Sequence, residues 1–136
     1  MIKKVKARTP NVGSRATARE TTRQPSNAER PRFTFHVITQ PFRVRDCQRE
    51  AKAAFAEWLE EVSKLTWQQI HQAPREGWGT EQIPHEQFSA ALPRAVTPDR
   101  QILSMRFGRG SRVIGYREDA TFHIIFVDPN HNAYAG

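Results

Sequence analysis

Hydrophobic and polar residues alternate along the last third of the chain, between residues 101 and 128. Alternation with a period of two puts successive side chains on opposite faces of a strand. Residues 108–111 and 118–119 interrupt the pattern with glycines or acidic residues, which favour tight turns. The pattern therefore predicts three consecutive strands, within the runs QILSMRFG, RGSRVIGYRED and ATFHIIFVD. The last run is almost continuously apolar, which is typical of a strand at the centre of a sheet.

The first half of the chain predicts one strand and a long helix. Alternating residues indicate a strand over residues 32–39, and Asp46 is expected to cap a helix over residues 47–65. Apolar residues recur in that helix at spacings of three and four and form one stripe. The stripe consists of Ala51, Ala54, Phe55, Trp58, Leu59, Val62 and Leu65.

A second, short helix is predicted to start at Thr66 and to stop at Pro74. Thr66 and Gln69 match the spacing of a capping box. Trp58 of the long helix and Trp67 of the short one are expected to be core residues. Residues 75–99 follow no period and predict a long irregular connection.

This order of elements predicts an α+β fold with two layers, namely strand–helix–helix–strand–strand–strand. The sheet is expected to be small and mainly antiparallel, with both helices packed on one face. The other face is then left to carry Arg106, Arg112, Arg117 and the polar groups of residues 128–134.

Charge divides the chain into two parts. The 136 residues carry a formal net charge of +7, and residues 1–32 hold nine Lys/Arg and two Glu, so the rest is formally neutral. Residues 1–31 have almost no large apolar side chains after Val12 and are expected to be a disordered basic tail. Residues 32–136 are expected to form a single domain. The tail is interpreted either as an electrostatic arm for nucleic acid or as a solvated leader.

The single cysteine, Cys47, rules out an intramolecular disulfide and a cysteine-based zinc cage. A cytoplasmic setting is therefore expected. No apolar stretch approaches the roughly 20 residues needed to span a bilayer, so no membrane partner is expected.

Candidate chemistry is concentrated at the end of the last predicted strand, at Asp128, Asn130, His131 and Tyr134. An imidazole titrates near neutrality, and a guanidinium on the neighbouring strand can bind phosphate through two parallel hydrogen bonds. His123, Asp128 and His131 could also be imagined as metal ligands. His123 and Asp128, however, are an odd number of residues apart and face opposite sides of an ideal strand, so no metal and no cofactor are expected.

The order of elements, the hairpin GSRVIGYRED and the last strand with its near-terminal tyrosine resemble the RelE/ParE toxin superfamily of bacterial toxin–antitoxin systems. The resemblance covers residues 32–134. In that superfamily a small antiparallel sheet cradles RNA, or a related sheet poisons gyrase. Arg112 matches the strand arginine of ribonuclease members, Tyr134 their near-terminal tyrosine, and His131 a C-terminal histidine or basic residue.

The resemblance implies a toxin that acts as a metal-independent mRNA endonuclease, on the ribosome or free, and is neutralised by an antitoxin protein. Arg112, His131 and Tyr134 would be its catalytic residues. The RNA-binding side chains are expected to be Arg106, Arg109, Arg117 and His123.

Other interpretations stay open on the sequence alone. Arg112 could be paired with Glu118 or Asp119, and His131 could be an ordinary loop histidine. The chain could also be a non-enzymatic toxin, or a phage or mobile-element protein, that binds a protein such as gyrase. A third alternative is a nucleic-acid-binding module.

Overall fold

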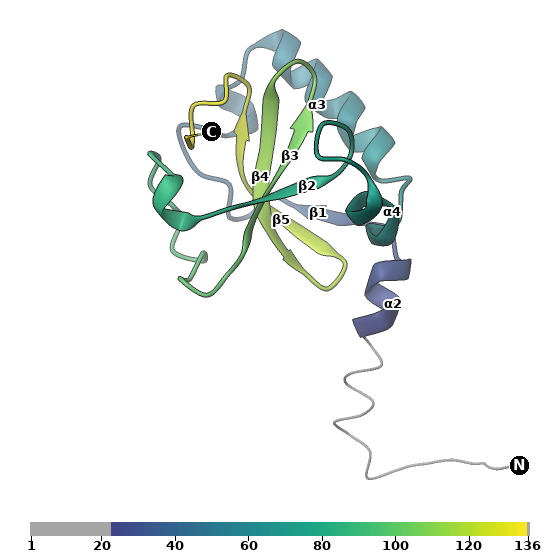
Figure 1. Ribbon diagram of the computed structural model, residues 1–136. Coiled ribbons are helices and arrows are strands. Elements are labelled where there is room, and N and C mark those ends of the chain that lie inside the picture. The colour runs from purple at the N-terminus through teal and green to yellow at the C-terminus, as the bar shows by residue number, and fades with distance from the viewer. Residues whose placement is uncertain (1–22, 136) are drawn as a thin grey trace, which may run out of the picture.

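A computed structural model of the chain describes residues 23–135, with side chains from residue 26 onward. In this part of the chain, a five-stranded sheet has the order β1-β5-β4-β3-β2 (Figure 1). Its strands are β1 (Arg32–Thr34), β2 (Thr80–Ile83), β3 (Ile102–Phe107), β4 (Ser111–Glu118) and β5 (Thr121–Asp128). β1 runs parallel to β5, and the other neighbours are antiparallel. The predicted α+β class and mainly antiparallel sheet are confirmed.

The sheet has one strand more than the sequence predicts. β2 lies inside the expected irregular connection and pairs along β3. Its four residues, TEQI, are too few to show a period. The strand expected over residues 32–39 is shorter than predicted, because the chain turns after Thr34 and Ile38 N donates to Phe35 O at 3.1 Å.

The helices within the described residues are α2 (Arg23–Ala28), α3 (Arg49–Val62) and α4 (Trp67–Gln72), with the 3-10 turns η1 (Val44–Asp46) and η2 (His85–Gln87). The predicted capping box at α4 is confirmed. Thr66 Oγ1 accepts from Gln69 N at 3.1 Å, and Gln69 Oε1 accepts from Thr66 N at 2.9 Å. No helix among these residues is both long and apolar enough to span a membrane.

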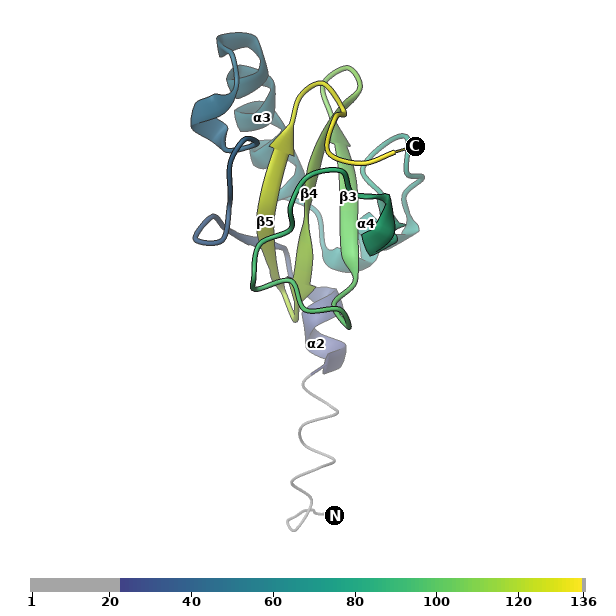
Figure 2. The same ribbon diagram turned by 90° about the vertical axis from the view of Figure 1, so that its left-hand side faces the viewer.

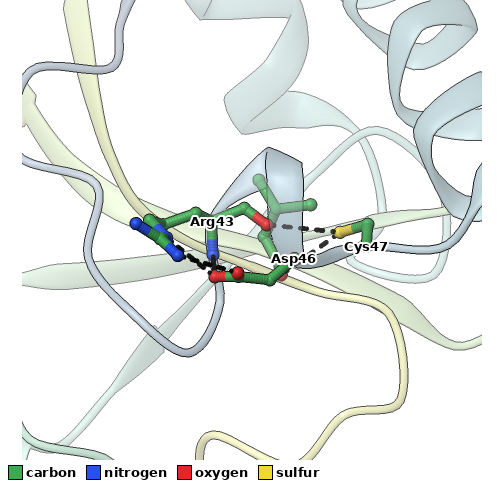
Figure 3. Close-up of polar contacts among 4 residues, drawn as sticks. Arg43, Asp46 and Cys47 are labelled. Atoms are coloured by element: carbon green, nitrogen blue, oxygen red, sulfur yellow. Dashed lines mark hydrogen bonds and ion pairs between the residues drawn. The ribbon is translucent and has the colours of Figure 1, made fainter.

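Asp46 does not cap α3, contrary to the prediction. It ends η1, and Gln48 stands at the N-cap of α3. The reason is a competing partner, because the Asp46 carboxylate accepts hydrogen bonds from Arg43 N at 3.0 Å and Arg43 Nε at 2.9 Å (Figure 3). Cys47 follows directly, with its Sγ 3.6 Å from Arg43 O. Burial, together with the Asp46 charge, raises the pKa of this thiol.

One face of the sheet packs against α3 and α4, as the apolar stripe predicts. Phe55, Trp58 and Val62 of α3 and Trp67 of α4 are buried in the same cluster. Trp67 Nε1 also donates to Ala120 O at 2.8 Å, which ties α4 to the turn between β4 and β5. The core assignment of the two tryptophans and the placement of both helices on one face are confirmed.

The opposite face is also an apolar core, which the sequence did not predict. Irregular segments and the C-terminal end cover it, and Figure 2 shows the C-terminus on the far side of the sheet from α3. The covering side chains include Val37, Phe42, Phe88, Leu92, Val96, Ala133 and Tyr134. The expectation of an open face carrying arginines is therefore wrong, because loops supply the apolar side chains that a second helical layer would otherwise supply.

The boundary of the basic tail also needs correction. Residues 1–22 of the expected tail lie outside the described residues. Residues 23–28, however, form α2, which contacts α4, and Ser26 is buried. Arg117 explains the attachment, because its guanidinium reaches Asn27 Oδ1 at 2.7 Å. Residues 23–28 of the expected tail are therefore helical and belong with the domain.

Candidate functional site

The predicted site residues fall at two opposite ends of the sheet. Arg112 of β4 pairs with Arg106 of β3 on one side and with Asp128 of β5 on the other, near the β3–β4 turn. His123 pairs with Tyr116 at the other end of the same strand. The structure therefore brings Arg106, Arg112, His131 and Tyr134 into one region, which we call the hairpin-end cluster. It places Arg117 and His123 in another.

Arg112 is the most deeply buried charged member of the hairpin-end cluster, with 6% of its surface exposed. Its Nη1 donates to Ser111 O at 3.3 Å, and its buried Nε has no hydrogen-bond partner. None of the ion pairs among the described residues involves Arg112. The alternative pairing with Glu118 is not formed, because that carboxylate contacts Arg100 and His123. A buried guanidinium without a carboxylate is costly and is typical of a site for an anion.

Asp128 lies across the strand pair from Arg112 but uses its carboxylate elsewhere. Asp128 is fully buried, and its two oxygens accept from Asn132 N at 2.9 Å and Ala133 N at 2.8 Å. These two bonds fold the chain back over the sheet after Pro129. The carboxylate therefore anchors residues 129–135 through their backbone N–H groups.

His131 stands in this returning segment with a left-handed backbone, at φ 57°. Its ring lies 4.7 Å from the ring of Tyr134, and its buried Nε2 has no hydrogen-bond partner. Burial lowers the pKa of His131, and the nearby charge of Arg112 lowers it further. Its imidazole is therefore mainly neutral at pH 7, as a general base must be.

Tyr134 is 6% exposed, and its hydroxyl lies 2.9 Å from Ser104 Oγ in the second core. The segment around it pairs with the chain after η2, because Ser89 N donates to Ala133 O and Ala135 N donates to Gln87 O, both at 3.0 Å. The tyrosine hydroxyl is thus already bonded. Its geometry suits a residue that positions His131 better than one that transfers a proton.

Two further arginines extend the hairpin-end cluster toward the surface. Arg106 is half-buried and lines a hollow of about 460 Å³ with Trp78 and Glu76. Arg109 is exposed in the β3–β4 turn and lines a neighbouring hollow of about 390 Å³. Arg106, Arg109 and Arg112 therefore place three guanidinium groups on one hairpin.

Arg117 does not face the hairpin-end cluster. Its guanidinium lies 4.3 Å from the centre of the Trp67 ring, on the helical face, and also contacts Asn27 and His71. Burial lowers its pKa. The predicted role in RNA binding is therefore not supported by position, since the side chain joins α2, α4 and β4.

His123 sits in a polar network at the opposite end of the sheet from Arg112. Its Nδ1 is 3.0 Å from Thr34 Oγ1, and its Nε2 is 2.9 Å from Glu118 Oε1. Thr34 and Glu118 are not among the predicted site residues, because the parallel pairing of β1 with β5 joins Thr34 to His123, 89 positions away. Alternation in β1 placed Thr34 on one face of its strand, but nothing in the sequence indicates its partner.

A bulge in β5 changes the relation between His123 and Asp128. Ile114 pairs with Phe126 while Gly115 pairs with Ile124, so Ile125 is the extra residue. His123 and Asp128 consequently share a face, contrary to the prediction from their odd spacing, but they lie at opposite ends of the strand. Among the described residues no group of three His, Cys, Asp or Glu side chains is arranged to hold a metal ion.

Comparisons of this chain with family models, with curated proteins and with solved structures found no match. The functional interpretation therefore depends on the site residues and on the sequence resemblance described above.

Proposed function

We propose that this protein is the toxin of a bacterial toxin–antitoxin system and cleaves mRNA without a metal ion, at the hairpin-end cluster. One observation carries the proposal. The buried Nε of Arg112 and the buried Nε2 of His131 both lack partners, and the two side chains are close enough for one charge to shift the pKa of the other. A phosphodiester would supply the anion and the acceptor that this arrangement lacks.

Each member of the cluster then has a chemical task. In metal-free RNA cleavage the 2′-hydroxyl attacks the adjacent phosphorus, and a base must take its proton. Neutral His131 is that base. As the bond from phosphorus to the 5′-oxygen breaks, the imidazolium returns the proton to that leaving oxygen, which yields a 2′,3′-cyclic phosphate and a free 5′-hydroxyl. Arg112, assisted by Arg106, binds the phosphate and stabilises the charge that develops on its oxygens. Tyr134 holds the imidazole by ring contact.

Access to Arg112 is the main structural requirement of this proposal. Arg112 is buried, His131 of the returning segment lies near it, and two hydrogen bonds to Asp128 hold that segment in place. We propose that RNA first contacts the exposed Arg109 and the half-exposed Arg106, and that the C-terminal segment then shifts to admit the phosphate. An RNA held on the ribosome would present its backbone in a fixed geometry for this exchange, and the antitoxin would prevent it in the cytoplasm.

The test is cleavage of a defined RNA by the purified full chain, with and without ribosomes. Arg112→Gln and His131→Asn should each lower cleavage by about a hundredfold or more, the usual loss when a catalytic base or charge stabiliser is removed. Arg94→Gln is the matched control, since Arg94 is an exposed arginine that belongs to neither site. Thermal melts must show that every variant folds.

Three outcomes would count against the proposal. Full cleavage and full growth arrest in both variants would remove Arg112 and His131 from the site. Growth arrest without RNA cleavage, with or without ribosomes, would favour the alternative of a toxin that binds a protein such as gyrase. Loss of RNA affinity and of its salt dependence on deletion of residues 1–22 would favour a nucleic-acid-binding module.

A further inference from the structure

We propose that Thr34 is an activated nucleophile, with His123 as its base and Glu118 as the group that orients the base. The three residues form a second site, at the opposite end of the sheet from the hairpin-end cluster. It would accept an acyl group from a carboxylic ester. This proposal is independent of RNA cleavage.

The three side chains form a continuous hydrogen-bonded chain. Thr34 Oγ1 lies 3.0 Å from His123 Nδ1, and His123 Nε2 lies 2.9 Å from Glu118 Oε1. A single neutral tautomer satisfies both contacts, because Nε2–H donates to the carboxylate and Nδ1 accepts from the hydroxyl. A hydroxyl within reach of a base, with the base held by a third group, is the geometric signature of an activated nucleophile. Such sites are recognised by the roles of the groups and not by their order in the sequence.

His123 is held in position by contacts on several sides. Its ring stacks on Tyr116 at 4.7 Å with an angle of 15° between the planes, and the side chain is only 12% exposed. Arg100 lies over the Tyr116 ring, 4.4 Å from its centre, and its Nη2 reaches Glu118 at 3.0 Å. The base and its orienting carboxylate therefore cannot rotate away without breaking several contacts, which is the preorganisation that catalysis requires.

Backbone pairing sets the position of the nucleophile. Thr34 is the last residue of β1 and lies directly beside His123 in the parallel pair of β1 and β5. The Thr34–His123 distance is thus set by the sheet and not by a loop. Sites built on strands hold their geometry more closely than sites built on loops.

An open cavity gives a substrate access to all three groups. It has a volume of about 960 Å³, and Thr34, His123 and Glu118 all line it. That volume is at the upper end of the range of small-molecule sites. Arg32 lines the same cavity and offers a cation for the negative charge of an acyl-transfer intermediate.

The proposed step is acyl transfer to Thr34. The hydroxyl oxygen attacks the ester carbonyl carbon, and its proton passes to Nδ1 of His123, where Glu118 stabilises the resulting imidazolium. The intermediate then collapses, the bond to the leaving alkoxide breaks, and the proton on Nδ1 moves to that oxygen. The products are an alcohol and an acyl ester on Thr34, which water can later hydrolyse to the free acid by the same steps.

The test uses p-nitrophenyl acetate with the full chain, followed by nitrophenol release and by mass spectrometry of the peptide that contains Thr34. We expect acetylation of Thr34 that is retained in Thr34→Ser and absent in Thr34→Val. His123→Gln should lower the rate at Thr34 by about a hundredfold, the usual contribution of a general base. Glu118→Gln should lower it to a smaller extent.

Thr121 provides the internal control, because it lines the same cavity but none of the hydrogen bonds found in the described residues joins its hydroxyl to a histidine. Acetylation of Thr121 should stay at background, and Thr121→Val should leave the rate at Thr34 unchanged. Equal labelling of Thr34 and Thr121, or unchanged labelling of Thr34 in His123→Gln, would overturn the proposal. Arg112→Gln must leave the labelling of Thr34 intact, so failure of RNA cleavage and failure of acylation are distinguishable.

Discussion

Gly115 lies so close to the backbone of His123 that a Cβ atom on Gly115 would fall 2.1 Å from the His123 carbonyl oxygen. Gly115 pairs with Ile124, the neighbour of His123, across the β4–β5 pair and next to the bulge at Ile125. The absence of a side chain at Gly115 is therefore what allows the strands to approach at this point. The bulge in turn sets which residues of β5 face each core.

Gly115→Ala should destabilise the fold by more than about 3 kcal/mol, because backbone would have to move to relieve the contact. The measurement is the free energy of unfolding in urea. Gly77→Ala is the matched control, since its Cβ would meet the nearest atom at an ordinary 3.6 Å. Similar urea unfolding midpoints for the two variants would show that the strands tolerate a side chain at position 115.

Patterns of hydrophobic spacing and capping residues predicted the elements whose formation depends on residues that are close together in the sequence. The stripe of α3, the capping box at Thr66 and the three C-terminal strands all follow from residues close together in the sequence, and the structure has them. Asp46 failed as a cap because Arg43, three residues earlier, binds its carboxylate. Spacing alone does not reveal which of two nearby partners a carboxylate takes.

The candidate sites depended on tertiary pairing and were harder to predict. The bulge at Ile125 reversed the expected faces of Asp128 and His123, and a bulge leaves no period in an apolar run. The parallel pairing of β1 and β5 created the Thr34–His123 contact, which no local signal indicates. The second core, made by loops, buried residues that alternation alone had placed on an open face.

The buried contact between Tyr134 and Ser104 should contribute measurably to stability. Tyr134→Phe and Ser104→Ala should each cost about 1 kcal/mol, because each leaves the other hydroxyl buried without its partner. The double variant should cost less than the sum of the two, and the difference is the coupling energy. If the free-energy costs of the two single variants simply add in the double variant, as measured by urea unfolding, the hydrogen bond between Tyr134 and Ser104 is contradicted.

Asp128 should be essential for holding the C-terminal segment against the sheet. Asp128→Asn replaces one of its two acceptor oxygens by a donor, so Asn132 N or Ala133 N loses its partner. The expected cost is about 2–4 kcal/mol, since hydrogen bonds to a buried charge are strong and their loss leaves a buried N–H unpaired. Amide exchange at residues 132 and 133 should speed up more than elsewhere. Asn130→Ala, at an exposed neighbour, is the control and should leave that exchange unchanged.

The carboxyl group of Asp46, in the turn before α3, should titrate at an unusually low pH. Hydrogen bonds from Arg43 lower the pKa of Asp46 to about 2 (Figure 3). Because the folded-state pKa lies below the unfolded value, the interaction favours the fold above about pH 4 and is lost as the pH falls through about 2. Carboxyl chemical shifts measured by NMR should give this pKa, and Arg43→Met should return it toward the ordinary range of an aspartate. An unchanged titration in Arg43→Met would contradict the assigned cause.

Mild acid should weaken the fold through His131. Burial and the charge of Arg112 lower the pKa of His131, Arg106 acts in the same direction, and Asp128 and Glu81 oppose it. Between the folded-state pKa and the ordinary value near 6.5, the unfolded chain binds a proton that the folded chain does not. Stability must therefore rise with pH through that window and level off above it.

The measurement is the free energy of unfolding in urea at intervals from pH 5.5 to 7.5. The wild-type curve should slope upward, and His131→Asn should flatten it. Burial also lowers the pKa of His71, with Arg117 as a second cause, so His71→Asn should remove a separate part of the slope. Because the two histidines lie on different elements, their contributions should add. An identical slope in wild type and His131→Asn would mean that the imidazole stays in the same protonation state on folding, and that it is not held neutral beside Arg112 as the proposed base must be.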